Sequence, residues 1–339
     1  MHSVQTPYVL FLGEAGAPDH PVSVKTAEGV FFWRSAQCVS QYRLDGAMAD
    51  LGLPDMSFEQ AVKAGAKTLL IGIANRGGVL SPSWLPHLTA ALEAGLDLAS
   101  GLHQRLTDHD VLVETAKANG RTLHDVRHWS GGALPIGDGR KRSGKRALMI
   151  GTDCSVGKNF TALALEKELI RRGEKATCRA TGQTGILITG QGVAIDAVPA
   201  DFVSGAVEMI TPDNDADHWD IVEGQASVLH PSFSAVTTGL VHGSQPDVMV
   251  LCHAAGREHL TGLPDRPLPS LVETIQAHLS VARVTNRDVR AVAVSLNTST
   301  LNQDEAKAAI TAASVQTGLP ATDPIRFGAG VLADAVLGG

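Results

Sequence analysis

Short apolar runs alternate with segments of helical periodicity along most of this chain. The apolar runs have the length of strands, and the periodic segments place their apolar residues on one helical face. The predicted strands are 8–12, 68–73, 146–151, 175–179, 219–222, 247–252 and 290–296. The predicted helices are 58–64, 83–94, 110–119, 158–172, 201–210, 270–283 and 304–317. Strands separated by helices of this length predict βαβ units, a mostly parallel sheet and an α/β fold.

One segment interrupts this alternation and predicts how the chain divides. Residues 137–146 read Gly-Asp-Gly-Arg-Lys-Arg-Ser-Gly-Lys-Arg, which is polar, glycine-rich and densely basic. This composition favours an exposed linker, with a phosphate-binding patch as the alternative. Because 339 residues exceed the usual size of one domain, we expect an N-terminal Rossmann-like domain over 1–136 and a second domain over 147–339.

Composition narrows the class of protein. The chain has 28 Lys and Arg against 35 Asp and Glu, a net charge of −7, which disfavours binding to nucleic acid. Its four cysteines form no C-x-x-C pair, as expected of reduced thiols. The N-terminus lacks the pattern of a signal peptide, and no apolar run is long enough to span a bilayer. We expect a cytoplasmic protein without a membrane partner.

The sharpest motif is Arg-Ala-Leu-Met-Ile-Gly-Thr-Asp-Cys-Ser-Val-Gly-Lys-Asn-Phe-Thr at 146–161. An apolar strand enters a turn, and Gly157-Lys158 opens a helix, so backbone N–H groups and an ammonium group meet at one point. This context predicts a phosphate-binding P-loop, with a tight connection carrying a surface lysine as the alternative. The candidate ligand-binding residues are Thr152, Asp153, Cys154, Ser155, Val156, Gly157, Lys158, Asn159 and Phe160.

Two departures from the usual motif bear on the ligand. Asn159 stands where a Ser or Thr hydroxyl usually binds Mg²⁺, and Gly151 lies one residue earlier than the standard spacing. Hydrolysis of a Mg²⁺-nucleotide is therefore disfavoured, and we expect no tightly bound metal. A phosphate-bearing ligand that need not be hydrolysed, such as coenzyme A, fits better. Cys154 could serve as an acyl-accepting thiol. We favour the alternative that this position holds a cysteine because a small side chain fits there.

Acid–base candidates follow the strand predicted at 219–222. Glu223 ends this strand, where P-loop proteins hold a metal or a water molecule, although a salt-bridged carboxylate is the alternative. His230 has a side chain able to take a proton near neutral pH, although a lone histidine is more often structural. We interpret Glu223 and His230 as the catalytic candidates and Gln225 as a substrate-binding one, without deciding which group is the base.

Candidate binding residues lie in three other places. Arg76, beside Gly77-Gly78, and Arg257, after Gly256, could each hold a carboxylate through a bidentate pair. Gln183 and Thr184 lie in the glycine-flanked segment 180–185 after a predicted strand, which favours a ligand-binding loop. An ordinary glycine turn explains that segment equally well.

These motifs together resemble a known family. The loop Gly151-Thr-Asp-Cys-Ser-Val-Gly-Lys158 resembles that of dethiobiotin-synthetase-type proteins, and the rest of the chain resembles the two-domain DUF1611 family, members of which are D-glutamate N-acetyltransferases of the DgcN type. The other segments that carry this resemblance are Gly72-Ile-Ala-Asn-Arg-Gly-Gly78, Ser100-Gly-Leu-His103, Leu123-His-Asp-Val-Arg127, Ala180-Thr-Gly-Gln-Thr-Gly185, Ile195-Asp-Ala-Val-Pro-Ala-Asp-Phe202, Val222-Glu-Gly-Gln225 and His230-Pro231.

The resemblance implies transfer of the acetyl group of acetyl-CoA to the amine of D-glutamate. Both would be small-molecule partners of a protein that we expect to be a homo-oligomer. Two alternatives stay open: a Mg-ATP-dependent ligase or kinase of the dethiobiotin-synthetase type, and a nucleotide sensor without catalytic activity. Dependence of product formation on nucleotide and Mg²⁺ would favour the first, and binding without turnover would favour the second.

Overall fold

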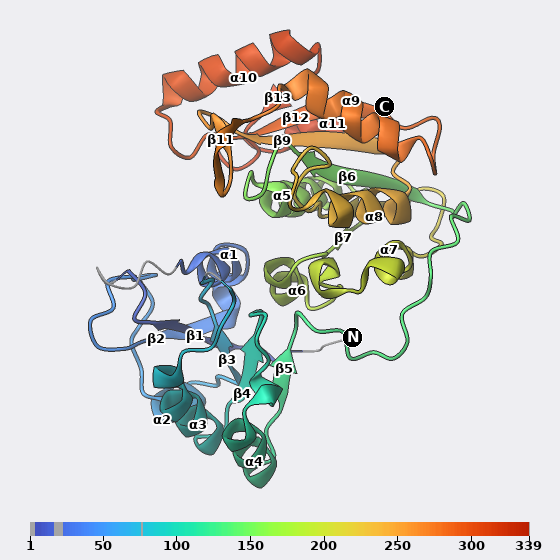
Figure 1. Cartoon of the computed structure of the whole chain (residues 1–339). Helices are drawn as coiled ribbons and strands as arrows, with labels where there is room; N and C mark the ends of the chain where they lie inside the picture. The colour runs from blue at the N-terminus through green and yellow to red at the C-terminus, as the bar shows by residue number, and fades with distance from the viewer. Residues whose placement is uncertain (1–3, 17–22, 76, 339) are drawn as a thin grey trace. The chain divides into compact units, whose positions relative to one another are not determined.

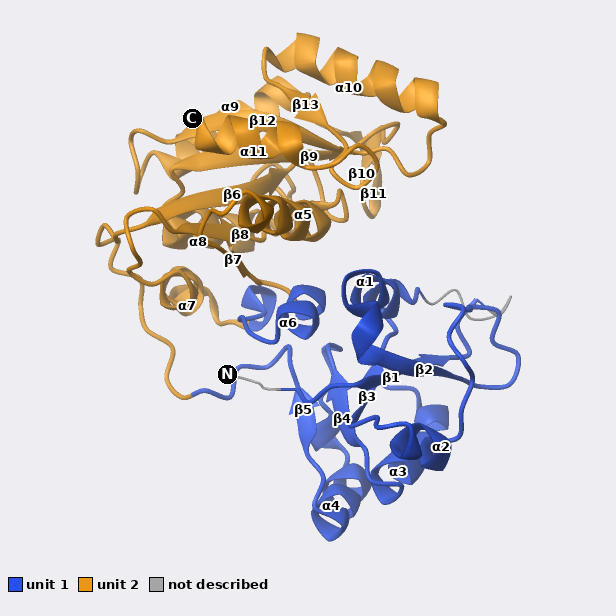
Figure 2. Cartoon of the chain, turned by 180° about the vertical axis from the view of Figure 1, so that it is seen from behind, with its two compact units in different colours: residues 1–131, 183–197 blue, residues 132–182, 198–339 orange. Residues whose placement is uncertain are grey.

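The computed structural model describes residues 4–16, 23–75 and 77–338. The chain folds into two compact units (Figure 2). The N-terminal unit comprises residues 1–131 and 183–197, and the C-terminal unit comprises residues 132–182 and 198–339. The chain therefore leaves the C-terminal unit once, at 183–197, to complete the N-terminal one. Among the described helices, none combines the length and hydropathy needed to cross a membrane.

The N-terminal unit is built on a five-stranded parallel sheet with the order β2-β1-β3-β4-β5 (Figure 1). The strands are β1 (Tyr8–Gly13), β2 (Cys38–Arg43), β3 (Thr68–Ile71), β4 (Asp97–Ser100) and β5 (Leu123–Asp125). The helices are α1 (Lys25–Arg34), α2 (Phe58–Lys63), α3 (Leu85–Glu93), α4 (Asp110–Asn119) and α6 (Gln183–Thr189). The registers pair Tyr8 with Thr68 and Thr68 with Asp97, so the carboxyl ends of these strands lie at one edge.

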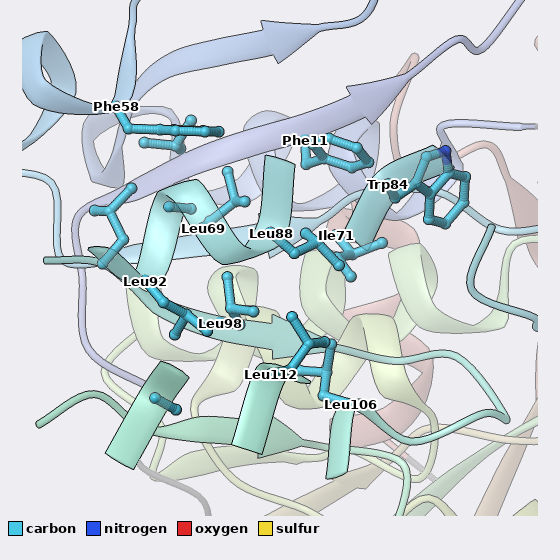
Figure 3. Packing of buried hydrophobic residues seen from close by; sticks show 14 of the residues in the cluster. Phe11, Phe58, Leu69, Ile71, Trp84, Leu88, Leu92, Leu98, Leu106 and Leu112 are labelled. Carbon is cyan, nitrogen blue, oxygen red and sulfur yellow. The ribbon is translucent and has the colours of Figure 1, made fainter. Parts of the chain in front are cut away.

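One apolar cluster joins this sheet to α2, α3 and α4 (Figure 3). Phe11 and Leu69 project from the sheet into it, and Leu88 and Leu112 project from the helices. Leu10, which points to the other face of β1, is also fully buried, and α1 contacts β1 and β3. A parallel sheet covered on both faces accounts for the continuous apolar sequence of β1.

The C-terminal unit is built on a six-stranded parallel sheet with the order β13-β12-β9-β6-β8-β7. The strands are β6 (Lys145–Gly151), β7 (Ala176–Arg179), β8 (Trp219–Val222), β9 (Val248–Ala254), β12 (Arg290–Asn297) and β13 (Ala321–Thr322). The helices are α5 (Lys158–Arg171), α7 (Val203–Ile210), α8 (Ser234–Ser244), α9 (Leu271–Ala282), α10 (Gln303–Thr317) and α11 (Gly330–Leu337). A short antiparallel ribbon, β10 (His259–Leu260) with β11 (Leu263–Pro267), follows β9.

The predicted α/β class and the parallel pairing are confirmed. All fourteen predicted strands and helices have counterparts, and the bounds of 110–119 and 219–222 match α4 and β8. The helix predicted at 201–210 differs because residues 200–202 form a 3-10 turn before α7. Capping chemistry explains the sharp helix starts: Ser270 caps α9 and Asn302 caps α10, each in a capping box with a glutamate three residues on.

Most residues of the basic segment at 137–146 are exposed, but two of its arginines are not. Arg142 and Arg146 are buried in the C-terminal unit. Arg142 Nη1 donates to Thr211 Oγ1 at 2.8 Å, and Arg146 Nη2 donates to the Arg142 carbonyl at 2.8 Å. Burial lowers the pKa of Arg142 to about 10, with the charge of Arg146 adding to the effect. The sequence pattern indicates only two positive charges at these positions. In the folded chain both guanidinium groups form hydrogen bonds with buried polar atoms.

Candidate active site

The phosphate loop connects β6 to α5 through residues 152–157. Ser155 and Gly157 both have left-handed backbone conformations, with φ of 52° and 101°. At Gly151, a Cβ atom would lie 2.8 Å from Lys158 Nζ, so a side chain there would displace the lysine. This backbone leads directly into the first turn of α5, whose unpaired N–H groups favour an anion.

Lys158 lies beneath the loop rather than on the surface. Its side chain is buried, and Nζ donates to the Asp153 carbonyl at 2.6 Å. Its stem passes Gly224, where a Cβ atom would lie 3.1 Å from Lys158 Cδ and only 1.6 Å from the Met149 carbonyl oxygen. Burial lowers the pKa of Lys158, although nearby acidic groups oppose that shift. An ammonium group has three donors. Within the described part of the chain the Asp153 carbonyl uses one of them, so two remain for a ligand.

Glu223 follows β8 at the carboxyl edge of the sheet. Its Oε2 accepts from the Thr181 N–H at 2.9 Å and from the Gly182 N–H at 3.2 Å, and Thr181 Oγ1 donates to the Glu223 carbonyl at 2.7 Å. Burial raises the pKa of Glu223 to about 7, against these N–H groups and the charge of Lys158. A carboxyl group that titrates near neutral pH can take a proton and release it again.

Asn159 occupies the first turn of α5 near Glu223. Its side chain opposes the rise in the pKa of Glu223, yet neither of its amide atoms has a hydrogen-bond partner of ordinary geometry among the described residues. Both atoms are shielded from solvent. Because an unpaired buried amide costs free energy, this side chain is suited to a ligand or a water molecule beside the carboxylate.

His230 lies near Asp153, whereas the hydrogen-bond partners of Glu223 are Thr181 and Gly182. The Ser232 N–H donates to His230 Nδ1 at 3.2 Å, so the neutral ring carries its proton on Nε2. That atom faces the Thr261 carbonyl at 3.4 Å and Asp153 Oδ1 at 3.7 Å. The ligand atoms of Asp153, Cys154 and His230 lie within 4.8 Å of one another. The protonated Nε2 suits a hydrogen-bonded pair better than a metal site, which would need that lone pair.

Arg257 is bonded to the phosphate loop. Its Nη1 lies 3.0 Å from Asp153 Oδ2 and 2.6 Å from the Cys154 carbonyl, and Nη2 lies 3.1 Å from the Ser155 carbonyl. The predicted partner of this arginine was a substrate carboxylate. In this structure its guanidinium group binds acceptors of the protein itself, and binding of a substrate carboxylate stays a prediction.

The other predicted residues lie in different places. Gln225 Nε2 donates to Thr181 Oγ1 at 3.1 Å, so Gln225 and Glu223 both form hydrogen bonds with Thr181. Gln183 and Thr184 begin α6 in the N-terminal unit, where Gln183 packs on Gly101 and Thr184 Oγ1 lies 3.4 Å from Thr26 Oγ1. Arg76 lies outside the described residues. The C-terminal unit alone therefore brings together the loop, Glu223, Gln225, His230 and Arg257.

Three residues of this site were not singled out from the sequence. Thr181 and Gly182 supply the N–H groups that bind Glu223, and Thr261 donates twice to Asp153. Residues 181–182 do lie within the segment 180–185 after β7, which the sequence already indicates as a ligand-binding loop, because carboxyl ends of parallel strands meet at one edge. Thr261 carried no signal, since its contact joins positions 108 residues apart.

Comparison with known proteins agrees with this two-part organisation. Residues 135–333 match a family model described as a DUF1611 C-terminal P-loop domain of unknown function, and residues 42–129 match the corresponding N-terminal Rossmann-like domain. A curated relative from Tritonibacter scottomollicae, named D-glutamate N-acetyltransferase, is 54% identical over 98% of this chain and 99% of its own. Another of the same name, from a Pseudoalteromonas species, is 45% identical over 96% of this chain and 97% of its own.

A solved structure matches as well. The crystal structure of a DUF1611 family protein from Anabaena variabilis is 34% identical in sequence and has a TM-score of 0.87, covering 99% of this chain and 100% of that one. With family models spanning both units and relatives similar over nearly the full length, this chain belongs to the DUF1611 family and combines a Rossmann-like domain with a P-loop domain.

Proposed function

We propose that this protein is a D-glutamate N-acetyltransferase that uses acetyl-CoA as the acetyl donor. The observation that carries the proposal is the pair of relatives of that name, which match it over 98% and 96% of its length. The site supports the donor: a helix-terminal phosphate loop with a buried lysine suits the diphosphate of coenzyme A. A carboxyl group with a pKa of about 7 lies on the same edge of the sheet.

In the proposed reaction, the phosphate loop and Lys158 hold the phosphates of the donor. Glu223 takes the proton that the ammonium group of D-glutamate must lose, directly or through a water molecule. The free amine then attacks the thioester carbonyl, so that a C–N bond forms and the C–S bond breaks. The nitrogen loses its second proton, and the leaving thiolate takes up one proton to become free CoA thiol. Asn159 offers its side-chain amide beside the carboxylate, and Arg76 remains our proposed ligand for a substrate carboxylate.

The direct test incubates the purified protein with acetyl-CoA and a panel of D- and L-amino acids while free CoA thiol is measured. We expect thiol release that depends on D-glutamate, with mass spectrometry identifying N-acetyl-D-glutamate. Product formation only with nucleotide and Mg²⁺ would instead establish the ligase or kinase alternative. Ligand binding without turnover for any amino acid would establish the sensor alternative.

Acetyl transfer should not depend on a divalent metal or a nucleotide. Asn159 replaces the hydroxyl group that binds Mg²⁺ in P-loop nucleoside triphosphatases, and the Nε2 proton of His230 faces the Thr261 carbonyl. We expect unchanged turnover after dialysis against excess EDTA and in the absence of ATP and GTP. Loss of activity in EDTA, restored by adding a metal ion, would contradict this prediction.

The pH dependence of kcat/KM for D-glutamate should report Glu223. Burial raises the pKa of its carboxyl group to about 7. The carboxyl group is therefore mostly protonated below that pH and mostly ionised above it. We expect kcat/KM to fall about tenfold per pH unit below pH 7. The amine of the free amino acid titrates at higher pH, so the two inflections are separable. A flat profile between pH 5 and 7 would remove Glu223 as the base.

A further inference from the structure

The segment after β9 is bound to the phosphate loop through one arginine and one threonine. Arg257 contacts three consecutive loop residues, namely the carboxylate of Asp153 and the carbonyls of Cys154 and Ser155, at 3.0, 2.6 and 3.1 Å. Thr261, in the turn between β10 and β11, donates to Asp153 Oδ2 through both its N–H and its Oγ1, each at 2.8 Å. The loop is thereby fixed from outside its own sequence.

Asp153 is the centre of these contacts. Its side chain is 0% exposed, and its second oxygen, Oδ1, accepts from the Cys154 N–H at 2.6 Å. Burial by itself would raise the pKa of this carboxyl group, but the hydrogen bonds from Thr261, Cys154 and Arg257 bring the pKa below its usual value. Asp153 is therefore ionised at neutral pH, and Arg257 is its counter-charge. Arg257 itself is partly exposed, but removing it is costly because the buried carboxylate of Asp153 loses its counter-charge.

The direction of the carbonyl groups determines where the loop N–H groups point. In a planar trans peptide, the N–H points away from the C=O. The carbonyls of Cys154 and Ser155 face Arg257, so the N–H groups of the following residues, Ser155 and Val156, point to the opposite side. Ser155 also holds a left-handed backbone conformation, with φ of 52°, which a non-glycine residue keeps only where its surroundings enforce it.

We propose that Arg257 is a positioning residue of the phosphate loop: with Asp153 and Thr261, it holds the peptides after Cys154 and Ser155 with their N–H groups turned toward the bound phosphates. This role differs from the carboxylate-binding role that the sequence predicted for Arg257. The identification of the phosphates as those of coenzyme A rests on the proposed function, whereas the effect on the loop does not.

The experiment compares the Arg257→Ala and Arg257→Lys variants with wild type. Arg266→Ala is the matched control, because Arg266 is exposed on β11 of the same ribbon. Three quantities are measured: hydrogen–deuterium exchange of peptides covering 151–160, the Kd for CoA by calorimetry, and the KM for D-glutamate at saturating acetyl-CoA. For Arg257→Ala we expect faster exchange in the loop and a Kd for CoA raised about 10- to 100-fold, with the KM for D-glutamate within about twofold of wild type.

Arg257→Lys should recover only part of this effect, because an ammonium group cannot reproduce the planar fork that spans three acceptors. The control Arg266→Ala should match wild type in all three measurements. Thr261→Val, which keeps the backbone N–H but removes the hydroxyl group, provides a milder second variant and should speed exchange in the same peptides to a smaller extent.

Two results would overturn the proposal. The first is a large rise in the KM for D-glutamate with the Kd for CoA unchanged, which would establish Arg257 as a substrate ligand. The second is unchanged exchange across 151–160 in both Arg257→Ala and Thr261→Val. If wild type neither binds CoA nor transfers acetyl groups, the proposed function fails while the exchange measurement still decides the positioning role.

Discussion

Replacing Glu223 with glutamine is expected to lower kcat by about 10²- to 10⁴-fold, the usual range for loss of a general acid–base group. Glutamine has the same shape, and its side-chain oxygen can still accept from the N–H groups of Thr181 and Gly182, which bind Oε2 at 2.9 and 3.2 Å. It cannot take a proton near neutral pH. The loss should therefore appear in turnover, with a much smaller change in the Kd for acetyl-CoA.

A carboxylate on the same strand supplies the control for this variant. Asp220 is also buried on β8, but its Oδ1 pairs with Arg179 Nε at 2.7 Å. We expect Asp220→Asn to lower thermal stability while kcat of the folded protein stays close to wild type. Steady-state kinetics and thermal unfolding of both variants check the contrast. Near-normal turnover by a folded Glu223→Gln protein would exclude Glu223 from the chemistry.

The sequence predicts the parts of this molecule whose signals are local. Glu223 could be identified because it ends an apolar strand, and Lys158 because it follows a glycine that opens a helix. The apolar periodicity of the strands and helices depends on burial of one or both faces, and that pattern survives in a single sequence. The loop, Glu223 and Gln225 were therefore predicted, and all lie in the C-terminal unit.

Elements and contacts that depend on distant residues were missed. The segment 180–185 is interpreted from the sequence as a glycine-flanked loop, yet its residues from Gln183 onward begin α6. This helix forms because its apolar residues are buried in the N-terminal unit, where α6 contacts α1. Arg142 and Arg146 look like surface charges, and only the folded chain supplies the carbonyls that they bind. Arg257 was recognised as important for its chemistry, but its partners lie more than 100 residues away. No periodicity encodes such pairings.

Replacing Lys158 is expected to weaken CoA binding by about 1.5–3 kcal/mol, the usual contribution of a charge-assisted hydrogen bond. Through the constant of 1.4 kcal/mol per tenfold change, this corresponds to a Kd raised roughly 10- to 150-fold. Lys158→Ala removes both the ammonium group and the stem that passes Gly224. Lys158→Met keeps most of that apolar stem and removes only the charge, so it separates the phosphate contact from packing.

The decisive comparison uses a donor without the diphosphate. If Lys158 acts on the phosphates, both variants should lose affinity for CoA by calorimetry, while kcat/KM measured with S-acetylpantetheine, which lacks those phosphates, should change by less than about twofold. Equal losses with both donors would place the effect of Lys158 at the reacting centre, next to Glu223. Unchanged CoA affinity in a folded Lys158→Met protein would mean that the phosphates bind elsewhere. Because Nζ already donates to the Asp153 carbonyl, both variants also leave that acceptor unpaired, and thermal unfolding without ligand measures this cost separately.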